Sequence, residues 1–534
     1  MASNNSSRPL DRRRFLGGAA LSAGALAFGG VLPGCSVSGK GTGPAGGRPN
    51  ILFLLADDLG WGDVKAFNPA SKIPTPNLDR LAREGMRFTD AHSGSAVCTP
   101  TRYGVVTGRY CWRSPLERGV LNGWSPHLIE PERWTVARLL EERGYHTACV
   151  GKWHLGMDFP RKGKKGGKRG KVDYEGRIEN GPNALGFDYF YGISASLDFP
   201  PYVYIENDRF TEVPDRIFPG SRFPAYLRRG PMGPSFKPME TLDHLAGKAE
   251  AYLEERAESR DGKPFFLYFA LTSPHKPVIP TPEFKGKSGL GDYGDHVMHT
   301  DAAVGRILDT LARSGLEKNT LLIITSDNGS FMFLVDSPDC PRRLVRRDPK
   351  TGKLLDHLDV PGIQGYLSSR HRPNGPFRGT KADIWEGGHR EPFIARWPGK
   401  IRPGSVCAET ICLGDLTATC AEISGGPLPE GAGPDSFSFL PLLLGKEETW
   451  SRPPVIHHSG NGTFAIREGK WKLIAGSGSG GRGVPRSRPW SRPYQLYDLE
   501  ADPGERENLI EKHPHIAARL TARLQEIIRA GRSV

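Results

Sequence analysis

A run of six apolar residues, Ile51 to Ala56, restricts this chain to a small group of folds. A strand that is apolar at every position is buried on both faces, as the central strands of parallel sheets are. Further strands are predicted at 145–150, 265–271 and 321–325. Helices are predicted at 77–84, 135–143 and 296–313, the first with Thr75 as its N-cap and Gly85 at its end. This alternation predicts an α/β fold with a large, mostly parallel central sheet flanked by helices.

The pattern changes at about residue 450. Short strands are predicted close together at 463–466, 471–474 and 494–499. The last helix carries an apolar stripe formed by Ile516, Leu520, Leu524 and Ile528. We therefore predict a small antiparallel sheet with a packed helix as a C-terminal subdomain over 450–534, after a catalytic domain over 48–449. Residues 330–377 show little periodicity, and a loop of that length is usually functional or disordered.

The N-terminus has the features of an export signal. Arg12-Arg13-Arg14 precedes a short apolar stretch rich in Gly and Ala, which resembles a twin-arginine signal. Leu32-Pro33-Gly34-Cys35 resembles a lipobox, in which Cys35 would carry a lipid anchor. We predict an export signal with a lipobox over 1–35 and a flexible tether over 36–47. The export machinery is then a partner and the protein is exported, periplasmic or at the outer surface; an uncleaved anchor or a disordered tail is the alternative.

The net charge of +13 is not spread over the chain. Residues 1–48 carry a net charge of +5 and residues 161–171 one of +7, which leaves +1 for all other residues. A nucleic-acid partner needs a basic surface on the body of a protein, so we expect no nucleic acid as a partner. The run at 161–171 contains glycines and no apolar residue, which favours a solvated loop over a rim that attracts polyanionic glycans.

Polar side chains follow four of the predicted strands. In chain order these residues are Asp57, Asp58, Lys152, His154, His275, Asp327 and Asn328. Ligands of open parallel sheets bind outside the carboxyl ends of the strands, so we expect one common site. Its acidic and amide members offer only oxygen ligands, which suit Ca²⁺ or Mg²⁺ better than Zn²⁺. Taken singly, each of these residues could instead be a helix cap or part of a turn.

Cys98 lies two residues before Pro100, a residue well placed for the first turn of a helix. A helix N-terminus attracts anions and lowers the pKa of a thiol, so we expect a lowered pKa for Cys98. The residues alone leave open a buried and inert thiol. Cys149 is expected to be buried in a strand. Five further cysteines could pair in an oxidising compartment, with no connectivity readable from the sequence: Cys111, Cys340, Cys407, Cys412 and Cys420.

The order of these motifs resembles that of the formylglycine-dependent sulfatases, the type I or arylsulfatase-like family. The resemblance rests on Cys98-Thr99-Pro100-Thr101-Arg102, Gly151-Lys152-Trp153-His154-Leu155-Gly156, Ser273-Pro274-His275, Asp327-Asn328-Gly329, Gly379-Thr380-Lys381 and Asp502-Pro503-Gly504-Glu505. It covers the chain from about Pro49 to Leu509. Thr101 stands where serine is commoner, and the pattern Cys-X-Pro-X-Arg is intact. The resemblance implies an alkaline-phosphatase-like sandwich and a hydrolase of sulfate esters, with sulfated carbohydrates as the expected substrates.

The resemblance also implies a role for each site residue. A separate maturase would oxidise Cys98 to formylglycine, whose hydrate attacks the sulfur and later expels sulfate. One Ca²⁺ per chain would be held by Asp57, Asp58, Asp327, Asn328 and the modified Cys98. Arg102 would steady the hydrate, Lys152 and Lys381 would neutralise sulfate oxygens, His154 would assist the proton of the hydrate, and His275 would protonate the leaving alcohol.

Two other functions remain open from the sequence. The first is a phosphomonoesterase or phosphodiesterase of the alkaline-phosphatase-like superfamily, whose members usually present Ser or Thr and bind paired metals through several histidines. The second is a glycan-binding surface lipoprotein with an unmodified Cys98 and no turnover. His371, Arg372 and Asn374 lie in the long loop, and we do not expect any single one of them to contact the substrate.

Overall fold

The computed structural model describes residues 47–163 and 170–533, and the chain from Arg48 onward forms one compact unit. The predicted export signal, Cys35 and the tether up to residue 46 lie outside the described residues, as does the middle of the basic run at 161–171. Among the helices of the described ranges, none has the length and apolarity that a membrane span requires.

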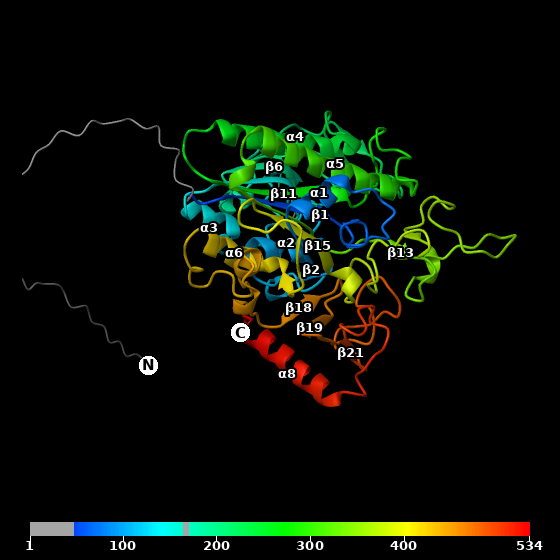
Figure 1. The fold of residues 1–534 in the computed structure, drawn as a ribbon. Coiled ribbons are helices and arrows are strands. Elements are labelled where there is room, and N and C mark those ends of the chain that lie inside the picture. The colour runs from blue at the N-terminus through cyan, green and yellow to red at the C-terminus, as the bar shows by residue number, and fades with distance from the viewer. Residues whose placement is uncertain (1–46, 164–169, 534) are drawn as a thin grey trace, which may run out of the picture. The chain divides into compact units, whose positions relative to one another are not determined.

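A large mixed sheet forms the centre of this unit (Figure 1). Its strands are β1 (Asn50–Asp57), β2 (Met86–His92), β3 (His146–Lys152), β6 (Tyr189–Ile193), β7 (Ile205–Glu206), β8 (Arg209–Phe210), β11 (Phe265–Pro274), β12 (Thr320–Ser326), β15 (Arg390–Arg396), β16 (Ser405–Cys407) and β17 (Ile411–Cys412). Their order is β16-β2-β15-β12-β1-β11-β3-β6-β7-β8, with β17 also beside β2. The five strands β12, β1, β11, β3 and β6 run parallel, whereas β15 is antiparallel to both of its neighbours. The predicted α/β fold with a mostly parallel sheet is confirmed.

Helices cover both faces of this sheet, which explains the apolar run in β1. The helices on one face are α1 (Pro76–Glu84), α4 (Thr241–Glu258) and α5 (Gly291–Arg313), and those on the other are α2 (Cys98–Thr107), α3 (Val136–Glu142), α6 (Leu416–Ile423) and α7 (Leu440–Leu443). Leu52 and Leu54 of β1 pack into the first layer, and Phe53 and Leu55 into the second. Alternate side chains of one strand therefore enter two separate cores, and no position can be polar.

The predicted start and end of α1 are confirmed, with Thr75 as its N-cap and Gly85 as its C-cap. Thr75 holds the N-cap position of α1, but its side chain makes no capping hydrogen bond. Its hydroxyl oxygen instead accepts a hydrogen bond from the backbone N–H of Lys65, at 3.1 Å. The hydroxyl group of Thr75 therefore binds the preceding loop and does not cap a backbone N–H of the helix.

The C-terminal part contains a separate antiparallel sheet with a packed helix. Its elements are β18 (Val455–His458), β19 (Phe464–Glu468), β20 (Trp471–Ile474), β21 (Gln495–Asp498) and α8 (Pro514–Ala530). Leu520 and Leu524 of the predicted stripe are fully buried, and Ile516 and Ile528 are partly buried. The short strand β18 was not predicted from the sequence. The boundary at 450 between a catalytic domain and a C-terminal subdomain stays a prediction.

The segment predicted as a long loop, 330–377, has its own small core. Within it, β13 (Phe333–Leu334) pairs with β14 (Gly365–Tyr366), and a cluster of Phe333, Val335, Cys340 and Ile363 is buried. Two further ribbons lie outside the main sheet: β4 (Arg161–Lys162) with β5 (Lys171–Val172), and β9 (Arg216–Phe218) with β10 (Gly230–Met232).

Candidate active site

The predicted site residues meet at the carboxyl ends of four neighbouring strands. Because β12, β1, β11 and β3 are adjacent and parallel, the residues that follow them lie at one edge of the sheet. A pocket of about 560 Å³ opens there, lined by Asp58, Cys98, His154, His275 and Lys381 among other residues. The other predicted residues, Asp57, Arg102, Lys152, Asp327 and Asn328, are fully buried next to this group and do not line the pocket.

The backbone at this edge is held in uncommon conformations. Asp58, His154 and Ala382 all have a positive φ, of 66°, 60° and 77°. Non-glycine residues pay a steric cost there, and such positions concentrate at functional sites. Gly151 has a φ of 111°, and a Cβ on it would lie 1.9 Å from the carbonyl oxygen of Ala270, so only glycine fits where β3 meets β11.

Cys98 is the first residue of α2 and is buried. Lys381 Nζ donates a hydrogen bond to Cys98 Sγ at 3.1 Å. The expected lowering of the thiol pKa is wrong: burial raises the pKa of Cys98 to about 11, although Lys152 and Lys381 act in the opposite direction. Loss of solvation outweighs the helix N-terminus and the two ammonium groups.

Three carboxylates and three basic side chains form a buried ionic group. Lys152 Nζ lies 2.7 Å from Asp57 Oδ2, and Lys381 Nζ lies 2.6 Å from Asp58 Oδ1. Arg102 binds Asp327 Oδ2 through two nitrogens, at 2.8 and 2.9 Å. Burial raises the pKa of Asp57 to about 7 and also raises that of Asp58. For Asp327 burial acts the same way, but Arg102 and the lysines outweigh it and lower the pKa.

The oxygen atoms of this group fit a hard divalent cation. Asp57 Oδ1, Asp58 Oδ2 and Asn328 Oδ1 are buried and accept no hydrogen bond within the described part of the chain. A buried oxygen without a partner costs free energy, so three of them side by side favour a bound cation. Oxygen-only donors suit Ca²⁺ or Mg²⁺. Ligand atoms of Asp57, Asp58, Cys98 and His275 also lie within 4.8 Å of one another.

Each of the two histidines of the site bonds to a backbone oxygen through one ring nitrogen. His154 Nε2 bonds to the backbone oxygen of Leu121 at 2.8 Å, which leaves Nδ1 as a buried lone pair without a partner among the described residues. His275 Nδ1 bonds to the oxygen of Lys276, and its Nε2 lies 3.7 Å from Asp58 Oδ2. Burial lowers the pKa of both imidazoles, and the nearby lysines add to the effect.

Several residues that line the pocket were not predicted from the sequence: Ser196, Asp198, Arg228, Lys276, Arg343 and Arg482. Asp198 is paired with Arg228 and lies 4.0 Å from Lys276, and its Oδ1 has no hydrogen-bond partner in the described ranges. Lys276 follows His275 directly, so that motif could have revealed it. The others come from irregular segments that carry no periodic signal.

His371 and Asn374 of the long loop bind other parts of the fold. His371 Nε2 lies 2.8 Å from Asp63 Oδ1, and Asn374 bonds to the backbone of Ser330. None of His371, Arg372 and Asn374 lines the pocket. The cysteines from Cys98 to Cys420 are all free and buried, so no disulfide forms among the described residues.

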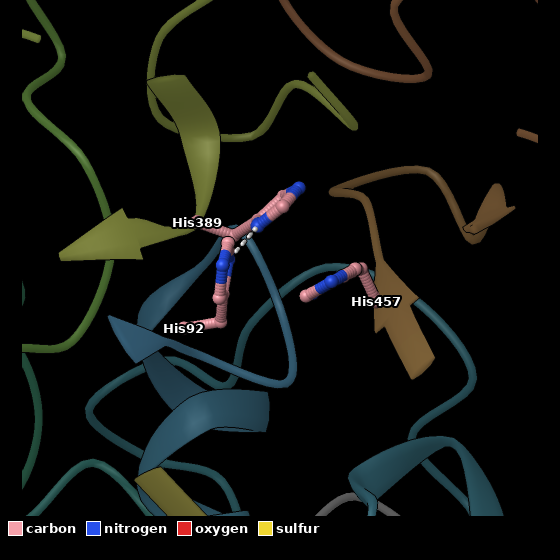
Figure 2. A group of neighbouring side chains, drawn as sticks. All are labelled: His92, His389 and His457. Atoms are coloured by element: carbon pink, nitrogen blue, oxygen red, sulfur yellow. Dashed lines mark hydrogen bonds between the residues drawn. The ribbon is translucent and has the colours of Figure 1, made fainter. Parts of the chain in front are cut away.

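A second group of titratable side chains lies in the interior, away from the pocket. The histidine cluster consists of His92 of β2, His389 before β15 and His457 of β18, which approach one another as Figure 2 shows. His92 Nδ1 lies 3.2 Å from His389 Nδ1. The rings of His389 and His457 stack at 3.8 Å with an angle of 15° between their planes. Ligand atoms of the three lie within 4.8 Å of one another, but ring lone pairs lie in the ring plane, so the stacked His389 and His457 cannot both point at one ion in this arrangement.

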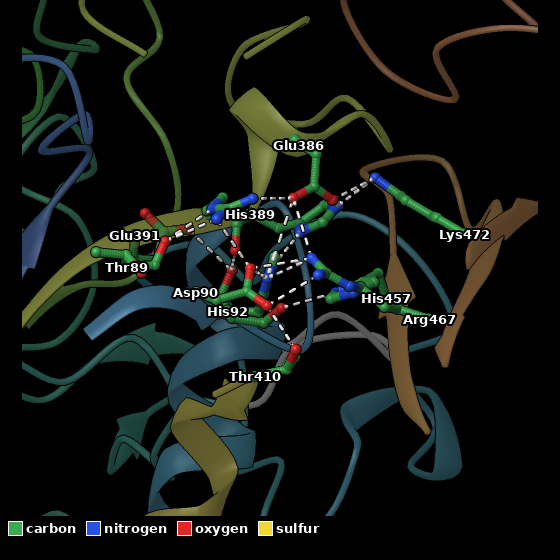
Figure 3. Close-up of polar contacts among 12 residues, drawn as sticks. Thr89, Asp90, His92, Glu386, His389, Glu391, Thr410, His457, Arg467 and Lys472 are labelled. Atoms are coloured by element: carbon green, nitrogen blue, oxygen red, sulfur yellow. Dashed lines mark hydrogen bonds and ion pairs between the residues drawn. The ribbon is translucent and has the colours of Figure 1, made fainter. Parts of the chain in front are cut away.

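Charged side chains surround the histidine cluster (Figure 3). Lys472 Nζ lies 2.9 Å from His389 Nε2, from Glu386 Oε1 and from Glu505 Oε1. His92 Nε2 lies 2.9 Å from Asp90 Oδ1, which Arg467 also binds. Because Lys472 and Arg467 come from β20 and β19, this network joins the C-terminal sheet to the main sheet.

Comparison with known proteins agrees with this geometry. The sulfatase family model matches residues 49–426, and the model of the C-terminal part of N-sulphoglucosamine sulphohydrolase matches residues 380–530. N-acetylgalactosamine-6-O-sulfatase of Bacteroides thetaiotaomicron is 34% identical over 93% of this chain and 96% of its own length. Arylsulfatase A of Homo sapiens is 34% identical over 86% of this chain and 83% of its own length.

The fold of this chain is also similar to that of solved sulfatase structures. A protein of Bacteroides thetaiotaomicron, described with the metabolism of multiple glycosaminoglycans, has a TM-score of 0.74 and 32% identity over 90% of this chain and 99% of its own. A sulfatase from Pseudoalteromonas sp. has a TM-score of 0.66 and 25% identity over 90% of each chain. The fold is thus alkaline-phosphatase-like, as the motifs implied. Since the family model covers most of the chain and the relatives match along nearly their whole length, this chain belongs to the sulfatase family and is a sulfuric ester hydrolase.

Proposed function

We propose that this protein hydrolyses sulfate esters of carbohydrates, with a formylglycine made from Cys98 and one bound Ca²⁺. The observation that carries the proposal is the setting of Cys98. It lies in Cys-X-Pro-X-Arg at the start of α2, lines the pocket, and has Lys381 at 3.1 Å. The unpartnered oxygens of Asp57, Asp58 and Asn328 belong to the same group of buried side chains.

The residues of the pocket suit sulfate transfer. Formylglycine hydrate would supply the attacking hydroxyl, and Ca²⁺ held by Asp57, Asp58, Asp327 and Asn328 would supply positive charge for the sulfate oxygens. Lys381 is the one basic residue of the buried ionic group that also lines the pocket, so we assign it to a sulfate oxygen. Lys152 is fully buried, so we assign it to keeping Asp57 ionised, together with Arg102 for Asp327.

The two histidines would move the protons. His154 Nδ1 carries a lone pair with no partner in the described part of the chain, and it would accept the proton that the hydrate loses. The bond from His275 Nδ1 to the oxygen of Lys276 orients Nε2, which protonates the leaving alcohol. Burial keeps His275 neutral in the free enzyme, and the negative charge of a bound sulfate ester favours its protonated form.

The proposal of a carbohydrate substrate rests on the relatives. One of them is named N-acetylgalactosamine-6-O-sulfatase, and one solved structure is described with glycosaminoglycan metabolism. The pocket supports this assignment because it adds hydrogen-bonding groups beyond the sulfate site. Asp198, Arg228 and Asn461 line it, and Asp198 Oδ1, which has no hydrogen-bond partner among the described residues, would accept from a sugar hydroxyl or amide.

The test combines mass and activity. The protein is produced with and without a formylglycine-generating maturase, and the tryptic peptide that contains Cys98 is analysed by mass spectrometry. Each preparation is assayed on N-acetylgalactosamine 6-sulfate, other defined sulfated saccharides and p-nitrophenyl phosphate. We expect turnover of a sulfated sugar in proportion to the formylglycine content, loss of turnover in Cys98→Ala, and normal turnover in the control Cys420→Ala. Full activity with an unmodified Cys98 contradicts the proposal.

We further propose that the protein is exported, through the signal over 1–35, to the periplasm or the outer surface. Arg12-Arg13-Arg14 and the lipobox ending at Cys35 support this proposal. Mass spectrometry of the mature N-terminus tests it. We expect cleavage before Cys35 with a lipid on its thiol, and a mature chain that begins near Met1 contradicts the proposal.

A further inference from the structure

A second cleft lies beside the catalytic pocket. It has a volume of about 870 Å³ and is lined by residues 338–343, residues 484–486, Arg378 and Arg506. The catalytic pocket is lined by Gly481 and Arg482 of the same C-terminal loop, and Arg343 lines both cavities. The linings of the pocket and the cleft therefore share Arg343 and neighbouring residues of one loop.

The cleft is strongly basic. Five arginines and a single carboxylate line it: Arg342, Arg343, Arg378, Arg486, Arg506 and Asp339. Arg378 binds Asp339 at 2.7 Å, and Arg506 binds it at 3.1 Å, so this carboxylate is already in use. In the described ranges, the side chains of Arg342, Arg343 and Arg486 take part in no hydrogen bond or ion pair, and all three are exposed.

This excess charge is local. Outside residues 1–48 and 161–171 the chain has a net charge of only +1. Three guanidinium groups without a partner in the described ranges, all around one cleft, therefore stand out from a nearly neutral chain. Burial lowers the pKa of Arg482 in the pocket, and Arg343 and Arg486 add to this effect against the opposite influence of Asp383 and Asp58. An anionic ligand that spans the pocket and the cleft would relieve this repulsion.

We propose that the arginine cleft, defined by Arg342, Arg343 and Arg486, is a subsite for a second anionic group of the substrate. The substrate is then a polyanionic saccharide chain, with one sulfate ester in the catalytic pocket and a further sulfate or carboxylate in the cleft. Planar guanidinium groups suit both anions because they donate paired hydrogen bonds. This inference rests on the proposed function and extends it from a single sulfated sugar to a chain.

The experiment compares a chain with a single sugar. The substrates are a chondroitin 6-sulfate hexasaccharide and N-acetylgalactosamine 6-sulfate, and the variant is Arg342→Ala with Arg486→Ala, both outside the catalytic pocket. Arg488→Ala is the matched control, since Arg488 is exposed on the same loop and lines neither cavity. We expect the ratio of kcat/KM for the hexasaccharide to that for the monosaccharide to fall about tenfold in the double variant, and not in the control.

Binding separates this inference from the proposed function. Calorimetric titration of the hexasaccharide into each protein needs no turnover, so it reports on the cleft even if the enzyme acts on another ester. We expect about tenfold weaker binding by the double variant, and a difference that shrinks as salt is added. Equal affinity of the double variant and the Arg488→Ala control, or no binding by the wild-type protein, overturns the proposal. Thermal melting of each variant controls for folding.

Discussion

Lys472 offers a sharp test of how the C-terminal sheet is held to the main sheet. Its side chain is fully buried, and its Nζ lies 2.9 Å from Glu386 and from Glu505. Replacing it with methionine keeps the volume but leaves two buried carboxylates without their shared cation. Breaking a buried pair from one side costs about 3–5 kcal/mol, because the remaining charge cannot be solvated. We expect Lys472→Met to lower the free energy of unfolding by about this amount.

The neighbouring Lys470 is the matched control. Its Nζ lies 2.7 Å from Asp498, but 42% of its side chain is exposed. Water screens such a pair, so Lys470→Met should change stability little or not at all. Urea unfolding followed by tryptophan fluorescence measures both variants at the same pH. If Lys472→Met unfolds no more easily than Lys470→Met, the reasoning about buried charge in this network is wrong.

The pH dependence of stability is a second test of the Lys472→Met variant. Burial raises the pKa of Glu505 to about 7, and the loss of Lys472 raises it further. A carboxyl whose folded pKa is raised stabilises the protein at low pH, and this contribution is lost as the pH rises through the folded pKa. The penalty of Lys472→Met should therefore be smaller at pH 6 than at pH 8. Glu505→Gln in the Lys472→Met background should restore part of the stability.

Further predictions concern the site, the histidine cluster and the sheet. His275→Ala should slow an unactivated sugar sulfate by about 10²–10⁴-fold and spare an activated aryl sulfate; equal losses on both argue against an acid role. Calcium chloride at 100-fold excess over Kd should stabilise the chelator-treated protein by about 2.7 kcal/mol. The melting temperature should rise accordingly, and Asp58→Asn should abolish that rise. Burial lowers the pKa of all three imidazoles of the histidine cluster. As the pH falls, these imidazoles therefore bind protons in the unfolded chain before they do so in the folded protein. Stability should then fall from pH 7 to pH 5.5, by about 1 kcal/mol for each imidazole that stays neutral in the folded protein, and an unchanged melting temperature contradicts this. Gly151→Ala should sharply reduce the yield of folded protein, as measured by circular dichroism, because its Cβ meets the oxygen of Ala270.

Local patterns in the sequence predicted much of the fold and the positions of the polar site residues. The apolar run in β1, the helices α1 and α5 and the antiparallel C-terminal strands depend on periodicity and turn residues over a few positions. Asp57 and Asp327 could be placed at strand ends for the same reason. The antiparallel strand β15 was missed because its pairing with distant segments leaves no local signal, and β18 was missed because it has only four residues.

By itself, then, the sequence determined several of the strands and helices, and which reactive residues follow the predicted strands. Only the tertiary structure decided that four of these strands are neighbours, that Lys152 is buried against Asp57 while Lys381 reaches the pocket, and that the thiol of Cys98 has a raised pKa. It alone brought Arg343 and Arg486 to one cleft from segments more than a hundred residues apart. The physical reason is that strand propensity is local, whereas burial and electrostatic interactions depend on which distant residues become neighbours.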